Sequence, residues 1–443
     1  MAAWRSLAST ALLLVVAPLA TAQTYPLAEA LAAGDCFKVR LEMSLAGELK
    51  VKRDGKTVPL KLAATATHEF PERVLTVGKT GLAEKVARVY QTAQATITAG
   101  DERSQRTLRP ERRLVVAQRH DEQSLAYSPA GGLTREELEL TGEHFDTLSL
   151  VGLLPGKAVA VGETWKVSNA AAQALCGFDG LTEQGLTCKL EEVKDNVARV
   201  TVTGTASGIE LGAQVKLTVD GAYRFDLGCK RLVGLDWRQK DDRDQGPASP
   251  ASSVRTTTEV TRTPIEQPPS LSDVALVSVP EGFEVPPPLV NLDYRDPKGR
   301  FVLAHGREWQ VVSQTDEHVV MRLMEQGEFV AQVTITPWTA DPNGKHMTAD
   351  EFKEAMARTP GWEPERELQT GEVPGAGDGH WVYRVSALGK MDGLDVMQNF
   401  YLVAGPKGQQ VVLLFTMTPK KAMKLGDRDL SMAGSIDFPA AKP

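Results

Sequence analysis

The side chains that could do chemistry are scattered along this chain and form no short catalytic pattern. No serine sits in a Gly-x-Ser-x-Gly turn and no His-Glu-x-x-His pair occurs, so two common hydrolase signatures are missing. A positioned nucleophile, acid–base group or metal usually leaves such local traces. The sequence therefore favours a non-catalytic protein with no metal and no cofactor. The histidines are expected at the surface or within the core: His68, His120, His144, His305, His318, His346 and His380.

Three polar segments resemble ligand sites but lack necessary parts. The glycine-rich run 375–379 has no Gly-Lys-Ser/Thr ending and precedes a strand, so it is expected to be a hairpin turn. The run 341–344 (DPNG) lacks the spaced oxygen ligands and closing glutamate of a calcium loop. Asp241, Asp242 and Asp244 could hold a cation, but a solvated turn between two strands is the preferred interpretation.

The four cysteines are Cys36, Cys176, Cys188 and Cys229. An even number in an exported protein favours disulfides. Three pairings are open, and the glycine-rich segment between Cys176 and Cys188 favours that pair, which leaves Cys36 with Cys229. A zinc site is the alternative, but clustered Cys/His ligands at short spacing are absent. Two disulfides within the first half of the chain are therefore predicted.

Four of the seven tryptophans fall in the last third of the chain. Core packing is the first explanation for them. Trp338 and Trp362, however, flank an expected helix within Pro- and Gly-containing segments. Exposed loop aromatics are typical of recognition surfaces, so these two are the candidate ligand-binding residues.

Residues 1–22 have the three parts of a secretory signal. A basic residue, Arg5, precedes the apolar run 11–20, and Ala20-Thr21-Ala22 supplies small residues at the cleavage position. The apolar run is too short to span a bilayer. A lipid anchor at Cys36 is the alternative, but Asp35 stands where a small residue is required. The sequence thus predicts a periplasmic or secreted protein with no membrane span after cleavage.

Composition narrows the possible partners. The 443 residues carry a formal charge of -7, with 42% hydrophobic and 24% charged residues. These are values of a folded globular chain long enough for two domains. A net negative charge argues against nucleic acid, whose phosphates need a basic face. An unknown protein or ligand of the cell envelope remains as the expected partner.

The first domain, residues 24–263, reads as β-rich. Segments such as 37–43 and 190–203 alternate apolar and polar residues, the latter as a hairpin turning at Asp195-Asn196. A second hairpin is expected over 211–225 with its turn at Asp220-Gly221. A curved antiparallel sheet or partly open barrel is predicted. The remaining predictions are strands at 232–238 and 254–262, a helix over 133–150 capped by Thr134, and a solvated basic loop at 105–113.

One short sequence motif in this domain resembles a motif of a known protein family. Residues 153–157 (LLPGK) and 161–165 (VGETW) resemble a phrase of an uncharacterised family of secreted bacterial domains. The resemblance implies a β-rich fold and export, and no activity. In physical terms, Gly162 allows a tight turn and Trp165 is expected to pack into the core.

A proline-rich linker is predicted over 264–288, within which 274–279 (VALVSV) could add as an edge strand. A second domain follows over 289–438. Fragment 290–443 is expected to fold by itself. Its helices are predicted at 348–359, with Thr348 and Glu351 as a capping box, and at 419–434. Strands are expected at 317–324, 328–336, 380–388, 394–404 and 409–417.

The second domain resembles the PsbP-like fold. The matching residues are Asp296–Phe301 with Trp309, the helix beginning near Asp350, and the hairpin from Asn399 through Thr416 with its closing helix. His305–Glu308 departs from the proline that often precedes the tryptophan in that family. The resemblance implies an α/β sandwich and a binding or accessory role, without a catalytic apparatus.

Together these observations predict an α+β protein: a β-rich domain followed by an α/β sandwich with an antiparallel sheet. The expected function is that of an exported, non-catalytic binding or accessory protein of the cell envelope. Two alternatives stay open. A cleft with two facing carboxylates would favour a hydrolase of envelope polymer, and an apolar cavity in the first domain would favour a carrier of an apolar ligand.

Overall fold

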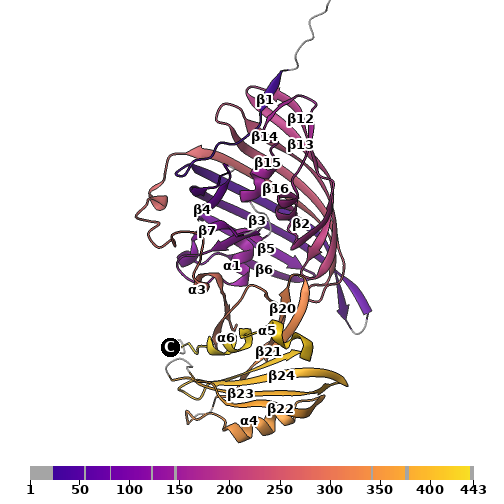
Figure 1. The fold of residues 1–443 in the computed structure, drawn as a ribbon, viewed down its shortest axis with the longest axis vertical. Helices are drawn as coiled ribbons and strands as arrows, with labels where there is room; N and C mark the ends of the chain where they lie inside the picture. Colours follow the sequence, from indigo (N-terminus) through magenta and orange to yellow (C-terminus); the bar gives the residue numbers. More distant parts are fainter. Residues whose placement is uncertain are drawn as a thin grey trace, which may run out of the picture.

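The computed structural model describes residues 23–53, 56–79, 81–120, 123–143, 147–340, 343–374 and 379–439 (Figure 1). Over these ranges the chain builds two large antiparallel sheets and two two-stranded ones, which confirms the predicted α+β class with a β-rich first half. The predicted export signal, the histidine at 144 and most of the run 375–379 lie outside the described residues. None of the described helices is long and apolar enough to cross a membrane.

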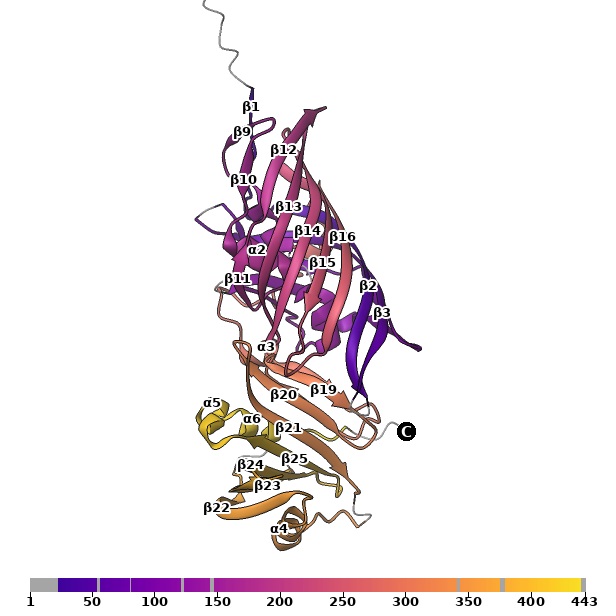
Figure 2. The ribbon, with the colours of Figure 1, turned by 90° about the vertical axis from the view of Figure 1, so that its right-hand side faces the viewer.

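The first domain is built around one large curved sheet, with a separate two-stranded pair of β1 and β9. Its main path runs β10-β12-β13-β14-β15-β16-β2-β3-β4-β7-β8, while β11 pairs with β13, and β5 joins β3 to β6. Figure 2 shows the long strands from β12 to β16 as one curved layer. The bounds are β1 Thr24–Pro26, β2 Cys36–Arg53, β3 Lys56–Val77, β4 Ala83–Val89, β5 Thr92–Ala99, β6 Glu102–Thr107, β7 Leu114–His120, β8 Gln123–Tyr127, β9 Ala158–Ala160, β10 Thr164–Lys166, β11 Gly180–Gln184, β12 Thr187–Lys194, β13 Val197–Glu210, β14 Ala213–Asp226, β15 Arg231–Arg243 and β16 Ala251–Ile265.

Strict alternation of burial explains why these long strands form a sheet with one apolar face. In β14 almost every second side chain is buried and the intervening ones are exposed. The hairpin predicted at Asp195-Asn196 is confirmed, because both residues have positive φ between β12 and β13. The hairpin predicted at Asp220-Gly221 is wrong, since β14 runs straight through it. A side chain at Gly221 would come within 2.7 Å of the Asp236 backbone oxygen, so close packing explains this glycine.

Short helices lie against the inner face of the curved sheet. They are α1 Arg135–Leu138, a π turn η2 Glu139–Glu143, a 3₁₀ segment η3 Thr147–Leu153 and α2 Asn169–Cys176. The predicted Thr134 cap is confirmed, and Glu137 completes a capping box. The continuous helix predicted over 133–150 is wrong, because the backbone leaves helical geometry at Gly142. Gly162, with φ of 87°, makes the predicted turn, and Trp165 packs against the core while donating to the Leu153 carbonyl at 2.9 Å.

The segment predicted as a linker packs onto the first domain. Leu271, in the 3₁₀ turn η4 Pro269–Leu271, is fully buried against Ala87 of β4. Lys85 Nζ donates to the backbone oxygens of Pro280 and Gly282, each at 2.6 Å. The edge strand predicted over 274–279 is wrong, because this stretch forms turns. The single short helix α3 Pro287–Val290 then leads to the second domain.

The second domain is a seven-stranded sheet of order β19-β20-β21-β25-β24-β23-β22 with helices on both faces (Figure 1). A separate pair, β17 and β18, precedes it. The bounds are β17 Leu292–Arg295, β18 Val302–His305, β19 Trp309–Gln314, β20 Val319–Glu325, β21 Glu328–Trp338, α4 Ala349–Ala357, β22 Trp362–Glu372, β23 Trp381–Met391, β24 Leu394–Ala404, β25 Gln410–Met417, η5 Pro419–Lys421, α5 Ala422–Leu425 and α6 Arg428–Gly434.

Both helical layers of this domain follow from local signals. Helix α4 has the predicted Thr348–Glu351 capping box and buries Phe352 against one face of the sheet. The helix predicted over 419–434 is interrupted, because Gly426 adopts φ of 58° and ψ of -132°, which separates α5 from α6. These two pack on the opposite face, where Met432 and Leu425 join the other core cluster.

The two domains touch through backbone and arginine contacts. The Asp293 amide donates to the Leu133 carbonyl at 2.8 Å, and the neighbouring Leu292 is fully buried in the core of the first domain. Arg307 Nη2 donates to the Ala126 carbonyl at 2.5 Å. Further contact comes from Arg135, whose guanidinium donates to the Trp309 carbonyl at 3.2 Å.

Candidate functional site

The inner face of the curved sheet contains a cavity of about 440 Å³. This volume lies within the range of small-molecule binding sites, roughly 300–1,000 Å³. The cavity is lined by β2, β3 and β5, by the neighbouring strands β15 and β16, and by residues of η2 and α2.

An aliphatic wall forms one side of the cavity. We use this name for Leu41, Met43, Leu45, Leu49, Leu62, Ala64, Ala66, Ala95 and Ile97, which come from β2, β3 and β5. The register places them side by side: Leu45 is opposite Ala64, and Ala64 is opposite Ile97. All except Leu41 are only half-buried.

The same strands are fully buried at their other end. Phe37 and Val39 of β2, and Phe70 of β3, are at most 2% exposed and belong to the main core cluster. The inner face therefore changes along β2 and β3 from a packed core to an uncovered apolar surface. Uncovered aliphatic side chains that line a concavity are typical of binding sites for apolar groups.

A polar wall continues the aliphatic surface across the pairing of β2 with β16. We use the name for Gln239, Asp241, Arg243, Ser252, Thr256 and Thr258 of β15 and β16. Trp237 and Val254 interrupt it with apolar surface, and Trp237 Nε1 donates to Gln239 Oε1 at 2.9 Å. The lining thus changes from aliphatic to hydrogen-bonding side chains along the curved sheet.

Among the titratable groups of this wall, Asp241 has the most strongly shifted pKa. Burial raises the pKa of its carboxyl to about 7, and Glu210 and Asp242 add to the rise, while Gln239 and Arg243 oppose it. Arg243 forms an ion pair with Glu210 at 3.2 Å. Cys176 of α2 also faces this carboxyl, and burial raises the pKa of its thiol to about 12. The turn predicted at Asp241 and Asp242 is wrong, because both lie within β15.

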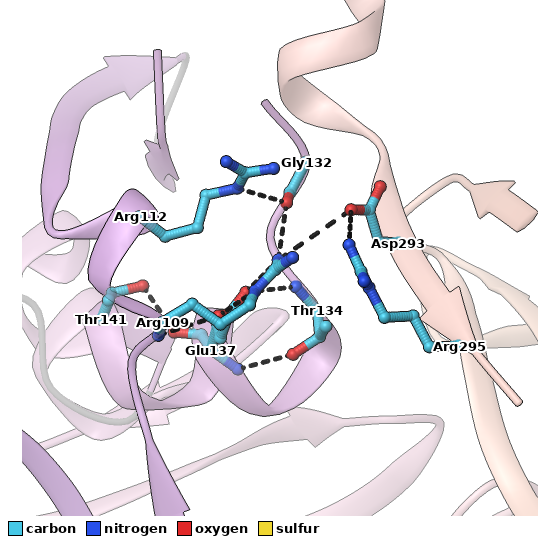
Figure 3. A network of polar contacts seen from close by, with 8 residues as sticks. All are labelled: Arg109, Arg112, Gly132, Thr134, Glu137, Thr141, Asp293 and Arg295. Atoms are coloured by element: carbon cyan, nitrogen blue, oxygen red, sulfur yellow. Dashed lines mark hydrogen bonds and ion pairs between the residues drawn. The ribbon is translucent and has the colours of Figure 1, made fainter. Parts of the chain in front are cut away.

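Helix α1 and η2 cover part of the cavity and are held in place by ion pairs (Figure 3). Arg109 Nε and Nη2 donate to the Glu137 carboxylate at 2.5 and 2.6 Å. Burial alone would raise the pKa of Glu137, but the bonds from Arg109 and Thr134 outweigh it and the pKa is lowered. Arg112 donates to the Gly132 carbonyl at 3.0 Å.

The basic run 105–113 is therefore more than a solvated loop. Arg106, from the same run, pairs with Glu139. Arg106 and Glu139 both line the cavity. Asp293 of the second domain lies 3.9 Å from Arg109, so the network of Figure 3 reaches across the domain boundary. These contacts fix the cover of the cavity relative to both domains.

A further cluster of polar residues lies at the packed end of the cavity. Arg88 and Glu72 form a buried ion pair at 2.8 Å, and Arg88 also donates to Thr147 at 2.7 Å. Tyr90 donates to the Thr141 carbonyl at 3.1 Å, and His68 contacts the Tyr90 ring edge-on. This group ties β3 and β4 to η2 and η3.

The predicted disulfides are absent from this structure, in which Cys36, Cys176, Cys188 and Cys229 are all free thiols. Cys176 ends α2, whereas Cys188 lies within β12 opposite Trp165, and both are buried in the apolar core. In these apolar surroundings both cysteines pack as small hydrophobic residues. Cys36 is buried as well, and only Cys229 is exposed.

Neither predicted tryptophan is an exposed loop residue. Trp362 begins β22, is 7% exposed and packs on Phe400. Trp338 ends β21 and packs edge-on against Phe352 of α4. Both therefore contribute to the core of the second domain. In the described part of the chain, no three His, Cys, Asp or Glu side chains are placed to hold a metal ion.

Sequence comparisons identify no relatives. No protein-family model matches this chain, and no curated protein matches it.

Structural comparisons give partial similarities. Cyanobacterial PsbP (CyanoP) from Synechocystis covers 36% of this chain and 99% of its own, at 14% identity and a TM-score of 0.28. A structure titled for lipid–protein interactions in lipovitellin covers 54% of this chain and 26% of its own, at 8% identity and a TM-score of 0.30. A structure from Bacteroides thetaiotaomicron covers 34% of this chain and 48% of its own, at 7% identity and a TM-score of 0.24. At these TM-scores, nothing about ligand or partner follows for this chain.

Proposed function

We propose that this is an exported, non-catalytic binding protein that holds an amphipathic molecule inside its first domain. The observation that carries the proposal is the cavity of about 440 Å³ lined by the aliphatic and polar walls. A molecule with both an apolar chain and a polar end would satisfy both walls at once.

The energetic argument rests on the uncovered aliphatic side chains. Each half-buried Leu or Ile of the wall keeps apolar surface in contact with water, which costs about 25 cal/mol per Å². A bound alkyl or acyl chain removes that surface from water without any rearrangement of the sheet. The contacts of Arg109 and Arg106 hold the cover in place, so the site is largely formed before a ligand enters.

A hydrolase of envelope polymer is the second candidate, favoured by one observation. The raised pKa of Asp241, with Glu210 nearby, is the kind of perturbation found in general acids. The sheet surface that continues from Asp241 through Val254 to Leu62 is aliphatic, however, and a sugar polymer needs hydrogen-bonding partners there. The same surface suits a hydrocarbon chain, so binding is the better-supported function.

A blocking substitution tests the proposal. Ala64→Trp places an indole within the cavity, at the centre of the aliphatic wall. Ala63→Trp is the matched control, because Ala63 is exposed on the other face of the same strand. Titration with a dodecyl chain that bears an uncharged fluorophore is expected to show saturable binding to the wild type and to Ala63→Trp, and none to Ala64→Trp. Equal binding by all three proteins would show that the cavity is not the site.

Export is tested separately. Signal cleavage after Ala22 predicts that the mature protein begins at Gln23 and is recovered outside the cytoplasm. Amino-terminal sequencing of protein from the envelope fraction would decide this, and an intact Met1 in cytoplasmic protein would contradict it.

A further inference from the structure

The head group of the ligand can be inferred from the charges of the polar wall. Arg243 is already paired with Glu210 across 3.2 Å, and Arg106 is paired with Glu139. Arg88 is paired with Glu72 at 2.8 Å. The cations that line the cavity are therefore neutralised by carboxylates of the protein.

Asp241 differs from these groups. Its Oδ1 is shielded from solvent and has no hydrogen-bond partner among the described residues, although a hydrogen bond from Gln239 to the carboxyl group lowers its pKa. The adjacent Asp242 points away and accepts a hydrogen bond from Ser253 at 2.6 Å. Among the described residues, Arg243 is the cation that lowers the pKa of Asp241, and it does not prevent the rise of that pKa to about 7. A carboxylate of this kind is destabilised when charged, and a cation beside it would stabilise it.

The register connects this carboxylate to the aliphatic wall. Asp241 is opposite Val254 in β16, Val254 is opposite Gly47 in β2, and Gly47 is opposite Leu62 in β3. Three strand spacings separate Asp241 from Leu62, roughly 14 Å along the curved sheet. Gly47 contributes no side chain at the centre of this row. An extended chain can therefore lie across the row, with one end at Asp241 and the other against Leu62.

We propose that the ligand is a cationic amphiphile whose ammonium-type head group binds Asp241 while its hydrocarbon chain covers the aliphatic wall. This inference rests on the proposed function and adds the charge of the ligand to it. A protonated amine would donate a charge-assisted hydrogen bond to the carboxylate, an interaction stronger than one between neutral groups. An anionic amphiphile would instead place two negative charges together.

The experiment compares three dodecyl compounds that differ only in the head group: dodecylammonium, dodecanol and dodecanoate. Affinity is measured by calorimetry near pH 8, below the micelle concentration, with the full chain. The wild type is expected to bind dodecylammonium at least about tenfold more tightly than dodecanol, the size of one charge-assisted hydrogen bond. Dodecanoate is expected to bind least.

Two neutralising variants identify the residue responsible. Asp241→Asn keeps the shape of the side chain and is expected to abolish the preference for dodecylammonium while dodecanol still binds. Asp242→Asn, the matched control on the outer face, is expected to keep the preference, which separates the cavity from general attraction by a negatively charged protein.

Each result separates the inference from the proposed function. Equal affinity for the three head groups, a preference for dodecanoate, or a preference that survives Asp241→Asn would overturn the cationic ligand and leave the binding cavity intact. If none of the three compounds binds the wild type, the proposed function fails and the inference fails with it.

Discussion

Truncation of Leu62 to alanine should separate a binding surface from a packed core. Leu62 lies in β3 and lines the cavity while only half-buried. Replacing a fully buried leucine by alanine costs roughly 2.7–5.0 kcal/mol, part of it from the cavity that remains. Leu62 already borders an open cavity, so its truncation creates no new one. Only the lost burial of the removed carbons then reduces stability. Three carbons at about 0.8 kcal/mol each, halved for partial burial, give a loss of about 1 kcal/mol.

The control is Leu235→Ala in β15. Leu235 is 1% exposed and belongs to the main core cluster, so a loss of about 3 kcal/mol is expected. Stability is measured by chemical denaturation of the full chain, and affinity by titration with the uncharged dodecyl compound. Leu62→Ala should weaken binding about fivefold, which corresponds to 1 kcal/mol. The reasoning is refuted if Leu62→Ala destabilises the fold as much as Leu235→Ala, or if it leaves affinity unchanged.

The remaining predictions concern protonation, thiols and modularity. Since burial raises the pKa of Asp241 to about 7, the folded chain binds a proton that the unfolded chain releases near its ordinary value. The free energy of unfolding should therefore fall from about pH 4 to about pH 7 relative to Asp241→Asn, and parallel denaturation curves would contradict this. In the native protein a thiol reagent should label Cys229 alone, with four thiols labelled after denaturation, as intact mass would show; four unreactive cysteines in the denatured chain would support disulfides instead. Fragment 290–443 should unfold cooperatively on heating, because its core clusters are formed almost wholly by its own residues; a soluble fragment without a transition would be evidence against independent folding.

Local signals in the sequence predicted the elements that depend on a few neighbouring residues. The capping boxes at Thr134 and Thr348 are present, and the turn at Asp195-Asn196 joins two strands as expected. In each case the element depends on a capping side chain or a positive φ that lies within four residues. Predictions that depended on the surroundings were less successful. Asp220-Gly221 has the composition of a turn, but pairing on both sides keeps β14 extended.

The cavity could not be found from one segment, because its walls come from strands distant in the sequence. Leu45 and Thr256 meet through the pairing of β2 with β16, which are about two hundred residues apart. A partial signal was available: the alternation that begins at Phe37 continues with aliphatic residues as far as Leu49, and resumes between Leu60 and Ala66. That the described residues leave this face uncovered, which defines the site, is visible only in three dimensions.

The cysteines illustrate a different difficulty. Their even number and the export signal favoured disulfides, but parity carries no information on geometry. Cys188 faces the core from a strand and Cys176 ends a helix, so each is satisfied by apolar neighbours. Asp241 is the opposite case, a residue assigned to a solvated turn that faces the cavity.

The most direct test of the central claim is the crystal structure of the full chain grown with dodecylammonium. We expect continuous electron density for a hydrocarbon chain against Leu45, Leu62 and Ile97, ending in a nitrogen within hydrogen-bond distance of the Asp241 carboxylate. An empty cavity at saturating ligand, or a chain bound elsewhere on the molecule, would contradict the account.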